Sequence, residues 1–186
     1  MSLKQRQRMF LALPLNASHQ HSIQAFRRQH AQLEQPGLRW LAAENLHITV
    51  FFLGDVFVRD SSAVAGAIRS ALLGFTPFSL HFEAFTLQPR KRPRMIWARF
   101  QQHALFSELA TRVGVACQPY LLNQGPAHKQ PIPHITVARM KSLSCDLILV
   151  NNIKLPAVRV NRCQLWLSEN RAGGTTYTSL ATFKLA

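Results

Sequence analysis

Apolar residues come in short groups along this chain, and the spacing within each group predicts its secondary structure. Groups that are continuously apolar or alternate with polar residues predict strands; these are residues 9–13, 38–42, 47–53, 78–87, 94–100, 134–137, 158–167 and 177–185. Groups with an apolar residue every three or four positions predict helices; these are residues 16–33, 61–73 and 103–117. Glycines predict turns at 54–55 and 173–174 and the end of the second helix at 74.

The sequence His-Ile-Thr-Val occurs twice within these strands, at 47–50 and at 134–137. Alternate side chains of a strand share a face, so each copy directs its His and Thr one way and its Ile and Val the other. The alternative interpretation is that both copies are ordinary surface strands. Each copy follows a predicted helix, and we therefore predict an α+β fold in which residues 1–186 form a single domain. Its two pseudosymmetric lobes, each an antiparallel sheet backed by helices, would face a central cleft that receives one histidine from each lobe.

The formal charge of the chain favours nucleic acid as the ligand. The 22 basic and 8 acidic residues give +14 over 186 residues, and such a field attracts polyanions. The densest basic segment, with Arg90, Lys91 and Arg92, is either a solvated hairpin loop or a contact with the RNA backbone. Phe10 and Tyr177 are candidates for stacking on terminal bases, whereas we expect Trp97 to pack in the core.

Cysteine usage and the N-terminus indicate a protein of a reducing compartment, and we expect the cytoplasm. Cys117, Cys145 and Cys163 form no Cys-x-x-Cys pair, and Cys163 lies in an apolar segment typical of a core. Residues 4–15 resemble a short signal peptide, but Pro14 and the lack of a cleavage site favour a first strand. No apolar run approaches the roughly 20 residues that span a bilayer.

Two histidines in one cleft suit phosphoryl chemistry without a metal. Opening a cyclic phosphate requires a base that takes a proton from water and an acid that protonates the departing ribose oxygen; histidine supplies either role near neutral pH. The hydroxyls of Thr49 and Thr136 can donate to the nonbridging oxygens. If the second strand ends or bulges before Arg139, the guanidinium can clamp the phosphate in a bidentate manner.

Other chemistries find little support in the sequence. The remaining histidines show no zinc-ligand spacing, and acidic residues are scarce for a two-metal centre. No glycine-rich nucleotide-binding motif is present. We therefore expect neither a metal nor a cofactor.

Two segments of the chain resemble the signatures of the 2H (two-histidine) phosphoesterases, in the branch of the bacterial and archaeal RNA 2′,3′-cyclic phosphodiesterases, also called 2′-5′ RNA ligases. These segments are Asn-Leu-His-Ile-Thr-Val-Phe-Phe-Leu-Gly at 45–54 and Pro-His-Ile-Thr-Val-Ala-Arg at 133–139. The likeness extends to residues 8–10, 95–97 and 176–178, and residues 129–132 depart from it. The resemblance implies phosphate binding by Arg139, a proton donor at His47 and a proton acceptor at His134, although symmetric chemistry also permits the reverse.

The resemblance implies an enzyme that opens RNA 2′,3′-cyclic phosphate ends to 2′-phosphomonoesters and that can also carry out reversible 2′-5′ RNA ligation. One alternative is a 3′–5′ exoribonuclease of the same superfamily, and another is a basic RNA-binding protein without catalysis. We expect a monomer whose partner is RNA with cyclic phosphate ends, with no membrane contact.

Overall fold

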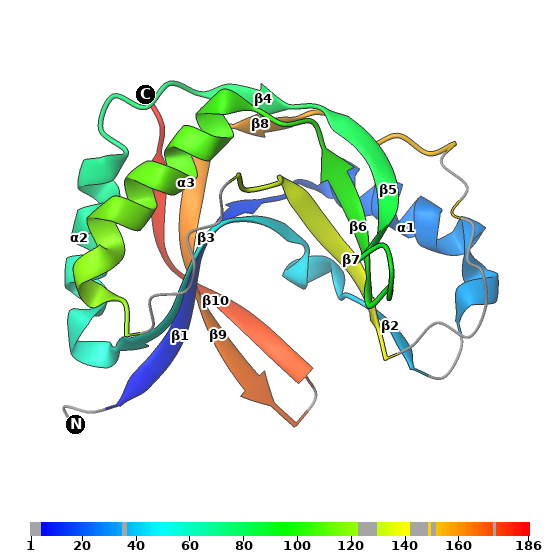
Figure 1. The fold of residues 1–186 in the computed structure, drawn as a ribbon, viewed down its shortest axis with the longest axis horizontal. Helices are drawn as coiled ribbons and strands as arrows, with labels where there is room; N and C mark the ends of the chain where they lie inside the picture. The colour runs from blue at the N-terminus through cyan, green and yellow to red at the C-terminus, as the bar shows by residue number, and fades with distance from the viewer. Residues whose placement is uncertain (1–4, 35–36, 123–129, 142–148, 150–151, 173) are drawn as a thin grey trace.

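The computed structural model describes residues 5–34, 37–122, 130–141, 149, 152–172 and 174–186 (Figure 1). Among these residues, eight strands form one sheet in the order β10-β9-β1-β3-β7-β6-β5, with β2 pairing with β7 beside this path. Every pairing between neighbouring strands is antiparallel. The strands are β1 (Arg6–Pro14), β2 (Leu38–Trp40), β3 (His47–Phe57), β5 (Phe82–Gln88), β6 (Met95–Phe100), β7 (His134–Met140), β9 (Arg162–Arg171) and β10 (Gly174–Lys184).

The helices cover the sheet in two groups. They are α1 (Ala17–Gln29), α2 (Ser61–Ala71) and α3 (Ala104–Cys117), with short 3-10 turns at Ala31–Leu33, Ala43–Asn45, Val58–Asp60 and Gln118–Tyr120. Figure 1 shows α2 and α3 together beside β1, β3 and β10, and α1 on the other side beside β2 and β5. Phe26 of α1 stacks on Phe85 of β5 with ring centroids 3.6 Å apart. The predicted α+β class of antiparallel strands backed by helices is therefore confirmed.

The sheet consists of two halves that meet at one pair of residues. The first half contains β1, β3, β9 and β10, and the second half contains β2, β5, β6 and β7. They join where β3 pairs with β7, and the register there comprises the single pair Ile48 and Ile135. The chain passes between the halves several times, so neither half is built from one continuous segment.

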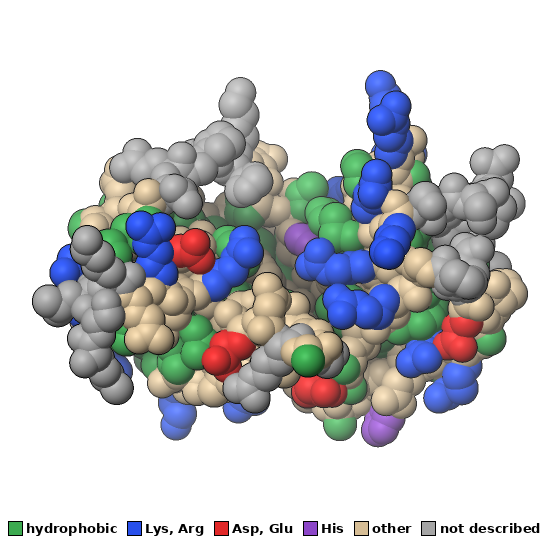
Figure 2. All heavy atoms as spheres, turned by 90° about the horizontal axis from the view of Figure 1, so that it is seen from below, with side chains coloured by type: hydrophobic (Ala, Val, Ile, Leu, Met, Phe, Trp, Pro, Cys, Tyr) green, Lys and Arg blue, Asp and Glu red, His purple; other side chains and the backbone are tan. Residues whose placement is uncertain are grey.

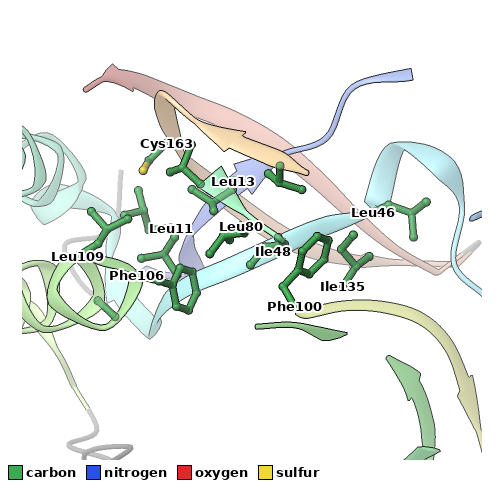
Figure 3. Close-up of a cluster of buried hydrophobic side chains, with 14 of the residues drawn as sticks. Leu11, Leu13, Leu46, Ile48, Leu80, Phe100, Phe106, Leu109, Ile135 and Cys163 are labelled. Carbon is green, nitrogen blue, oxygen red and sulfur yellow. The ribbon is translucent and has the colours of Figure 1, made fainter. Parts of the chain in front are cut away.

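The second residues of the two repeats form the centre of the core. Ile48 and Ile135 are both 0% exposed, and Figure 3 shows them beside Phe100 in one apolar cluster. The alternation of the repeat therefore directs Ile inward and His outward, as the sequence predicts. Cys117 and Cys163 are buried and unbridged, and burial raises the pKa of Cys163 to about 12, which confirms its place in the core. Cys145 lies outside the described residues.

Two predicted boundaries in the first part of the chain are wrong. The first helix begins after Asn16, whose side chain accepts a hydrogen bond from the backbone N–H of His19 at 3.2 Å, but it ends at Gln29 rather than at 33. The turn predicted at 54–55 is a bulge inside β3. Gly54 adopts a φ of 72°, which glycine tolerates, and the pairing with β1 shifts register at this point.

Two predicted strands are interrupted in the structure. Segment 78–87 divides into β4 (Phe78–Leu80) and β5, and segment 158–167 divides into β8 (Val158–Val160) and β9. The reason is that β4 and β8 pair with each other in a separate two-stranded sheet. Among the described residues, no helix is long and apolar enough to cross a membrane.

Candidate active site

Both His-Ile-Thr-Val repeats line the same cleft, which has a volume of about 830 Å³. His47 and Thr49 reach it from β3, and His134 and Thr136 reach it from β7. Figure 2 shows a hollow with a histidine side chain at its bottom and several Lys and Arg side chains beside it. The two histidines immediately precede the residue pair that joins the halves, so backbone pairing brings them to one place.

The two imidazoles are held in the same way. The Nδ1 atom of His47 lies 2.7 Å from the carbonyl oxygen of Asn45, and Nδ1 of His134 lies 2.8 Å from that of Ile132. A carbonyl oxygen can only accept, so each Nδ1 donates a proton and each Nε2 is left as the reactive atom. Nε2 of His47 also lies 3.1 Å from the hydroxyl of Thr49.

A bulge in β7 turns Arg139 into the cleft. Thr136 pairs with Trp97 and Ala138 with Ile96, so one extra residue, Val137, lies between them on β7. The alternation therefore shifts by one, and Arg139 follows His134 and Thr136 on the cleft face. From the sequence, Arg139 is expected to reach a phosphate only if the strand ends or bulges before it, and β7 has such a bulge.

The same irregularity occurs at the equivalent place in β3. Thr49 pairs with Ala12 and Phe51 with Leu11, so Val50 is the extra residue. The residue that follows His47 and Thr49 on the cleft face is Phe52, and its side chain is 50% exposed. Phe52 and Arg139 thus occupy equivalent positions, each five residues after a histidine.

The aromatic surroundings of the two histidines differ. Three rings surround His47: Phe10 at 4.9 Å, Trp166 at 5.1 Å and Tyr177 at 5.2 Å between centroids. His134 instead stacks on Trp97 at 3.6 Å with an interplanar angle of 17°. These rings fix the orientation of both imidazoles and exclude water from one side of each.

This environment lowers the pKa of both histidines in the free protein. Burial lowers the pKa of His47 to about 4, and Arg139 and the protonated form of His134 act in the same direction, against the Asn45 carbonyl. Burial also lowers the pKa of His134, opposed by the Ile132 carbonyl. The effect of His134 and Arg139 on His47 shows that these groups share one electrostatic environment.

The walls of the cleft are basic. Arg8, Arg39 and Arg139 line it, and the acidic residue lining it is Asp55. The guanidinium carbon of Arg8 lies over the ring of Phe52, 4.9 Å from its centroid, a cation–π contact. Among the described residues, no group of three or more His, Cys, Asp or Glu side chains is placed to hold a metal ion.

The sequence has relatives whose names describe this kind of chemistry. Residues 13–97 match the family of LigT-like phosphoesterases. The chain is 26% identical over 155 residues to the RNA 2′,3′-cyclic phosphodiesterase of Methanothermobacter thermautotrophicus, covering 80% of this chain and 83% of that protein. It is 31% identical over 137 residues to the protein of the same name from Geobacillus stearothermophilus, covering 72% of this chain and 42% of the relative. Over residues 13–97 the chain is therefore similar to the LigT-like phosphoesterases.

Solved structures agree with this similarity. The fold of this chain matches that of Escherichia coli LigT in its apo form with a TM-score of 0.77 at 24% identity, covering 98% of this chain and 99% of that one. It matches E. coli LigT complexed with NADP+ with a TM-score of 0.75 at 26% identity, covering 97% and 99%. The resemblance shown by the two signatures is therefore confirmed.

The structure brings together five of the predicted site residues. His47, Thr49, His134, Thr136 and Arg139 all line the cleft; their individual roles stay predictions.

The predicted RNA contacts lie at different places. Tyr177 lines the cleft beside His47. Phe10 is 2% exposed and lies under His47, so it offers almost no surface to a base. Arg90, Lys91 and Arg92 lie in an exposed loop between β5 and β6 and do not line the cleft. Trp97 is partly buried against His134 rather than in the core.

The sequence-based prediction also missed several residues of the cleft, among them Arg8, Arg39 and Phe52. Comparing the two repeats position by position identifies Phe52, because it stands where the second repeat has Arg139. The sequence carries no equivalent signal for Arg8 and Arg39, since each reaches the cleft through strand pairing.

Proposed function

We propose that this protein is an RNA 2′,3′-cyclic phosphodiesterase that opens the cyclic end of RNA to a 2′-phosphomonoester without a metal. The observation that supports it most is the pair of imidazoles in one cleft with Arg139, each with Nδ1 bonded to a backbone carbonyl and Nε2 left as the reactive atom. The names of the curated relatives agree with this chemistry. We propose further that residues 1–186 act as one two-lobed domain, as a cytoplasmic monomer.

The reaction is an in-line displacement at phosphorus. One histidine takes a proton from water as the water oxygen bonds to phosphorus, and the other gives a proton to O3′ as the P–O3′ bond breaks. Arg139 and the hydroxyls of Thr49 and Thr136 hold the nonbridging oxygens and stabilise their charge. Ligation is the same displacement with a 5′-hydroxyl in place of water: the 5′ oxygen bonds to phosphorus as the P–O3′ bond breaks and O3′ takes the proton, which leaves a 2′-5′ linkage.

We assign His47 as the proton donor and His134 as the proton acceptor. In the free protein His47 has a pKa of about 4, so it must gain its proton when the negatively charged phosphate enters the cleft and raises that pKa. A substrate with sulfur in place of O3′ tests the assignment, because a thiolate leaves without a proton. On that substrate His47→Ala should keep most of the wild-type rate and His134→Ala should remain inactive; the opposite pattern reverses the roles.

The terminal base rests on Phe52. Its ring is half-exposed and carries Arg8 across it, whereas Phe10 is covered. Base–aromatic stacking contributes about 1–3 kcal/mol. Tyr177 forms another wall of the same cleft, and the loop of Arg90, Lys91 and Arg92 contacts the RNA backbone farther from the cyclic end.

The deciding experiment is an assay in EDTA on an oligonucleotide that ends in a 2′,3′-cyclic phosphate. We expect an oligonucleotide of unchanged length that carries a new 2′-monoester. Shortening of the oligonucleotide would favour the exoribonuclease, and unchanged substrate that is nevertheless bound would favour an RNA-binding protein without catalysis.

A further inference from the structure

Two arginines stand directly opposite each other across β2 and β7. Arg39 of β2 pairs in register with Arg139 of β7, and both side chains line the cleft. Residues directly opposite in an antiparallel pair lie on the same face, with Cβ atoms roughly 4.5–5.5 Å apart, and like charges there are destabilising. An anion that contacts both side chains would offset this repulsion.

No protein group supplies that anion among the described residues. Within that part of the chain, neither Arg39 nor Arg139 forms an ion pair, and Asp55, the acidic residue of the cleft wall, stands opposite Arg8 instead. The histidines contribute no negative charge. Among the described residues, the pair of guanidinium groups therefore has no acidic partner.

The side chain of Arg39 lies beside the backbone of the other half of the sheet. Its Nη1 atom lies 3.3 Å from the position that a Cβ on Gly174 would occupy, and Gly174 has a φ of 123°. Gly174 begins β10, which is tied to the start of β3 by the bond from Nδ2 of Asn45 to the carbonyl oxygen of Thr175 at 3.0 Å. Arg39 thus extends from the second half to the rim formed by the first half, beside the catalytic groups.

The charge of the substrate explains why two arginines are needed. A cyclic phosphodiester carries one negative charge, which one bidentate guanidinium can match. In RNA, the ribose that bears the 2′,3′-cyclic phosphate also bears the next phosphate on its 5′ oxygen. A cleft that binds the end of a chain therefore meets a second charge close to the first.

Given the proposed function, on which this step rests, we propose that Arg39 binds the phosphate on the 5′ oxygen of the terminal nucleoside while Arg139 holds the cyclic phosphate. This second phosphate site makes the enzyme select chain ends over free nucleoside cyclic phosphates. It also predicts that recognition needs only the 5′-phosphate charge, not a second base.

The test compares three substrates: adenosine 2′,3′-cyclic phosphate, the same compound with a 5′-phosphate, and the dinucleotide ApA with a 2′,3′-cyclic end. For the wild type we expect kcat/KM to be about 10-fold higher with either second phosphate, the size of one charge-assisted hydrogen bond. A dinucleotide with an uncharged methylphosphonate linkage should lose this preference. If only the dinucleotide is preferred, and its methylphosphonate analogue equally, a second base is being read and the proposal is wrong.

Arg39→Ala should reduce the preference to within about 2-fold of unity, because the second phosphate loses its partner whereas the cyclic phosphate keeps Arg139. Arg39→Lys should keep part of the preference. The control is Arg28→Ala, which removes the same charge from the exposed surface of α1 and should preserve the preference. Equal losses on all substrates, or a preference that survives Arg39→Ala, would overturn the proposal.

A binding measurement separates this inference from the proposed function. A wild-type protein that opens none of the substrates contradicts the proposed function. Calorimetry with adenosine 3′,5′-bisphosphate and 3′-AMP then still decides the role of Arg39. We expect the bisphosphate to bind about 10-fold more tightly, and Arg39→Ala to remove this difference; equal affinities in the wild type would refute the second phosphate site.

Discussion

The two repeats of this chain carry the same four residues and the same backbone bond to Nδ1, yet their surroundings differ. His47 lies among three aromatic rings and is followed on the cleft face by Phe52, whereas His134 lies on one ring and is followed by Arg139. The half around His47 thus offers apolar surface, and the half around His134 offers charge. This difference teaches that a symmetric pair of acid–base groups can act on an asymmetric substrate, one half holding the base and the other the phosphate.

Removing either imidazole should have the largest effect, because the chemistry needs both halves. We expect His47→Ala and His134→Ala each to lower kcat on the cyclic oligonucleotide by about 10²–10⁴-fold in EDTA, with RNA affinity within about 2-fold of wild type. The exposed His81 provides the matched control, since His81→Ala should leave kcat unchanged. Full activity in either variant would show that the two repeats do not act as a pair.

Replacing the residue that follows each histidine on the cleft face should test the difference between the two halves. Arg139→Ala should lower kcat/KM by about 10²-fold, because the reacting phosphate then has no guanidinium to match its charge. Phe52→Ala should mainly raise KM, by about 10-fold, because the terminal base has no ring to stack on. Steady-state kinetics on one oligonucleotide checks both. If the two variants changed kcat and KM alike, the proposed division between base and phosphate would fail.

The pH profile should report the burial of both imidazoles. The pKa values of both histidines lie below the ordinary 6.5, with that of His47 at about 4. The free enzyme therefore reaches the state that the mechanism needs, with one histidine protonated and the other neutral, only at acidic pH. We expect a bell-shaped profile of kcat/KM with its maximum below pH 6.5 and a maximum of kcat at higher pH, because bound phosphate raises both pKa values. A profile that is flat between pH ~5 and ~8 would contradict the two-histidine mechanism.

The lowered pKa values of the two histidines also make folding stability depend on pH. The folded protein binds fewer protons than the unfolded chain between pH 6.5 and about 4, so the free energy of unfolding is full above this window and decreases as pH falls through it. His47 alone should account for about 1–3 kcal/mol. Denaturant titrations of wild type and His47→Gln at several pH values measure this, and the variant should show the smaller decrease; equal slopes would argue that His47 is solvated.

The basic loop should show the smallest effect, since it lies outside the cleft. Replacing Arg90, Lys91 and Arg92 by Ala should leave kcat unchanged and reduce the dependence of RNA affinity on salt by a slope of about 0.7 for each phosphate that the loop neutralises in the wild type. Titrations of a single-stranded oligonucleotide at several salt concentrations measure the slope. An unchanged slope would identify the loop as an ordinary solvated hairpin.

The sequence predicted the parts of the site that depend on strand alternation. His47 with Thr49, and His134 with Thr136, share a face because they are two residues apart. Alternation continued without interruption would have placed Phe51 on that face, but the bulge turns Phe51 toward Gly114 of α3 and brings Phe52 to the cleft. Bulges arise from pairing with another strand, so periodicity within one strand does not reveal them.

Residues that reach the site through distant pairing were not predictable for the same reason. Arg39 belongs to a three-residue edge strand, and nothing local indicates that its partner is β7. The division of 78–87 and 158–167 has the same origin, because β4 and β8 leave the main sheet only to pair with each other. The overall α+β class, by contrast, was predictable because it depends on the spacing of apolar residues within each segment and not on which strands pair.

The single register pair of β3 and β7, Ile48 with Ile135, has a consequence for how this enzyme can change. Since each isoleucine follows its histidine directly, main-chain geometry at the seam sets the gap between the two imidazoles. The surrounding walls come from other strands and can be rebuilt without disturbing that gap. Substitutions in the cleft walls can therefore change which substrates bind while the two histidines keep their spacing.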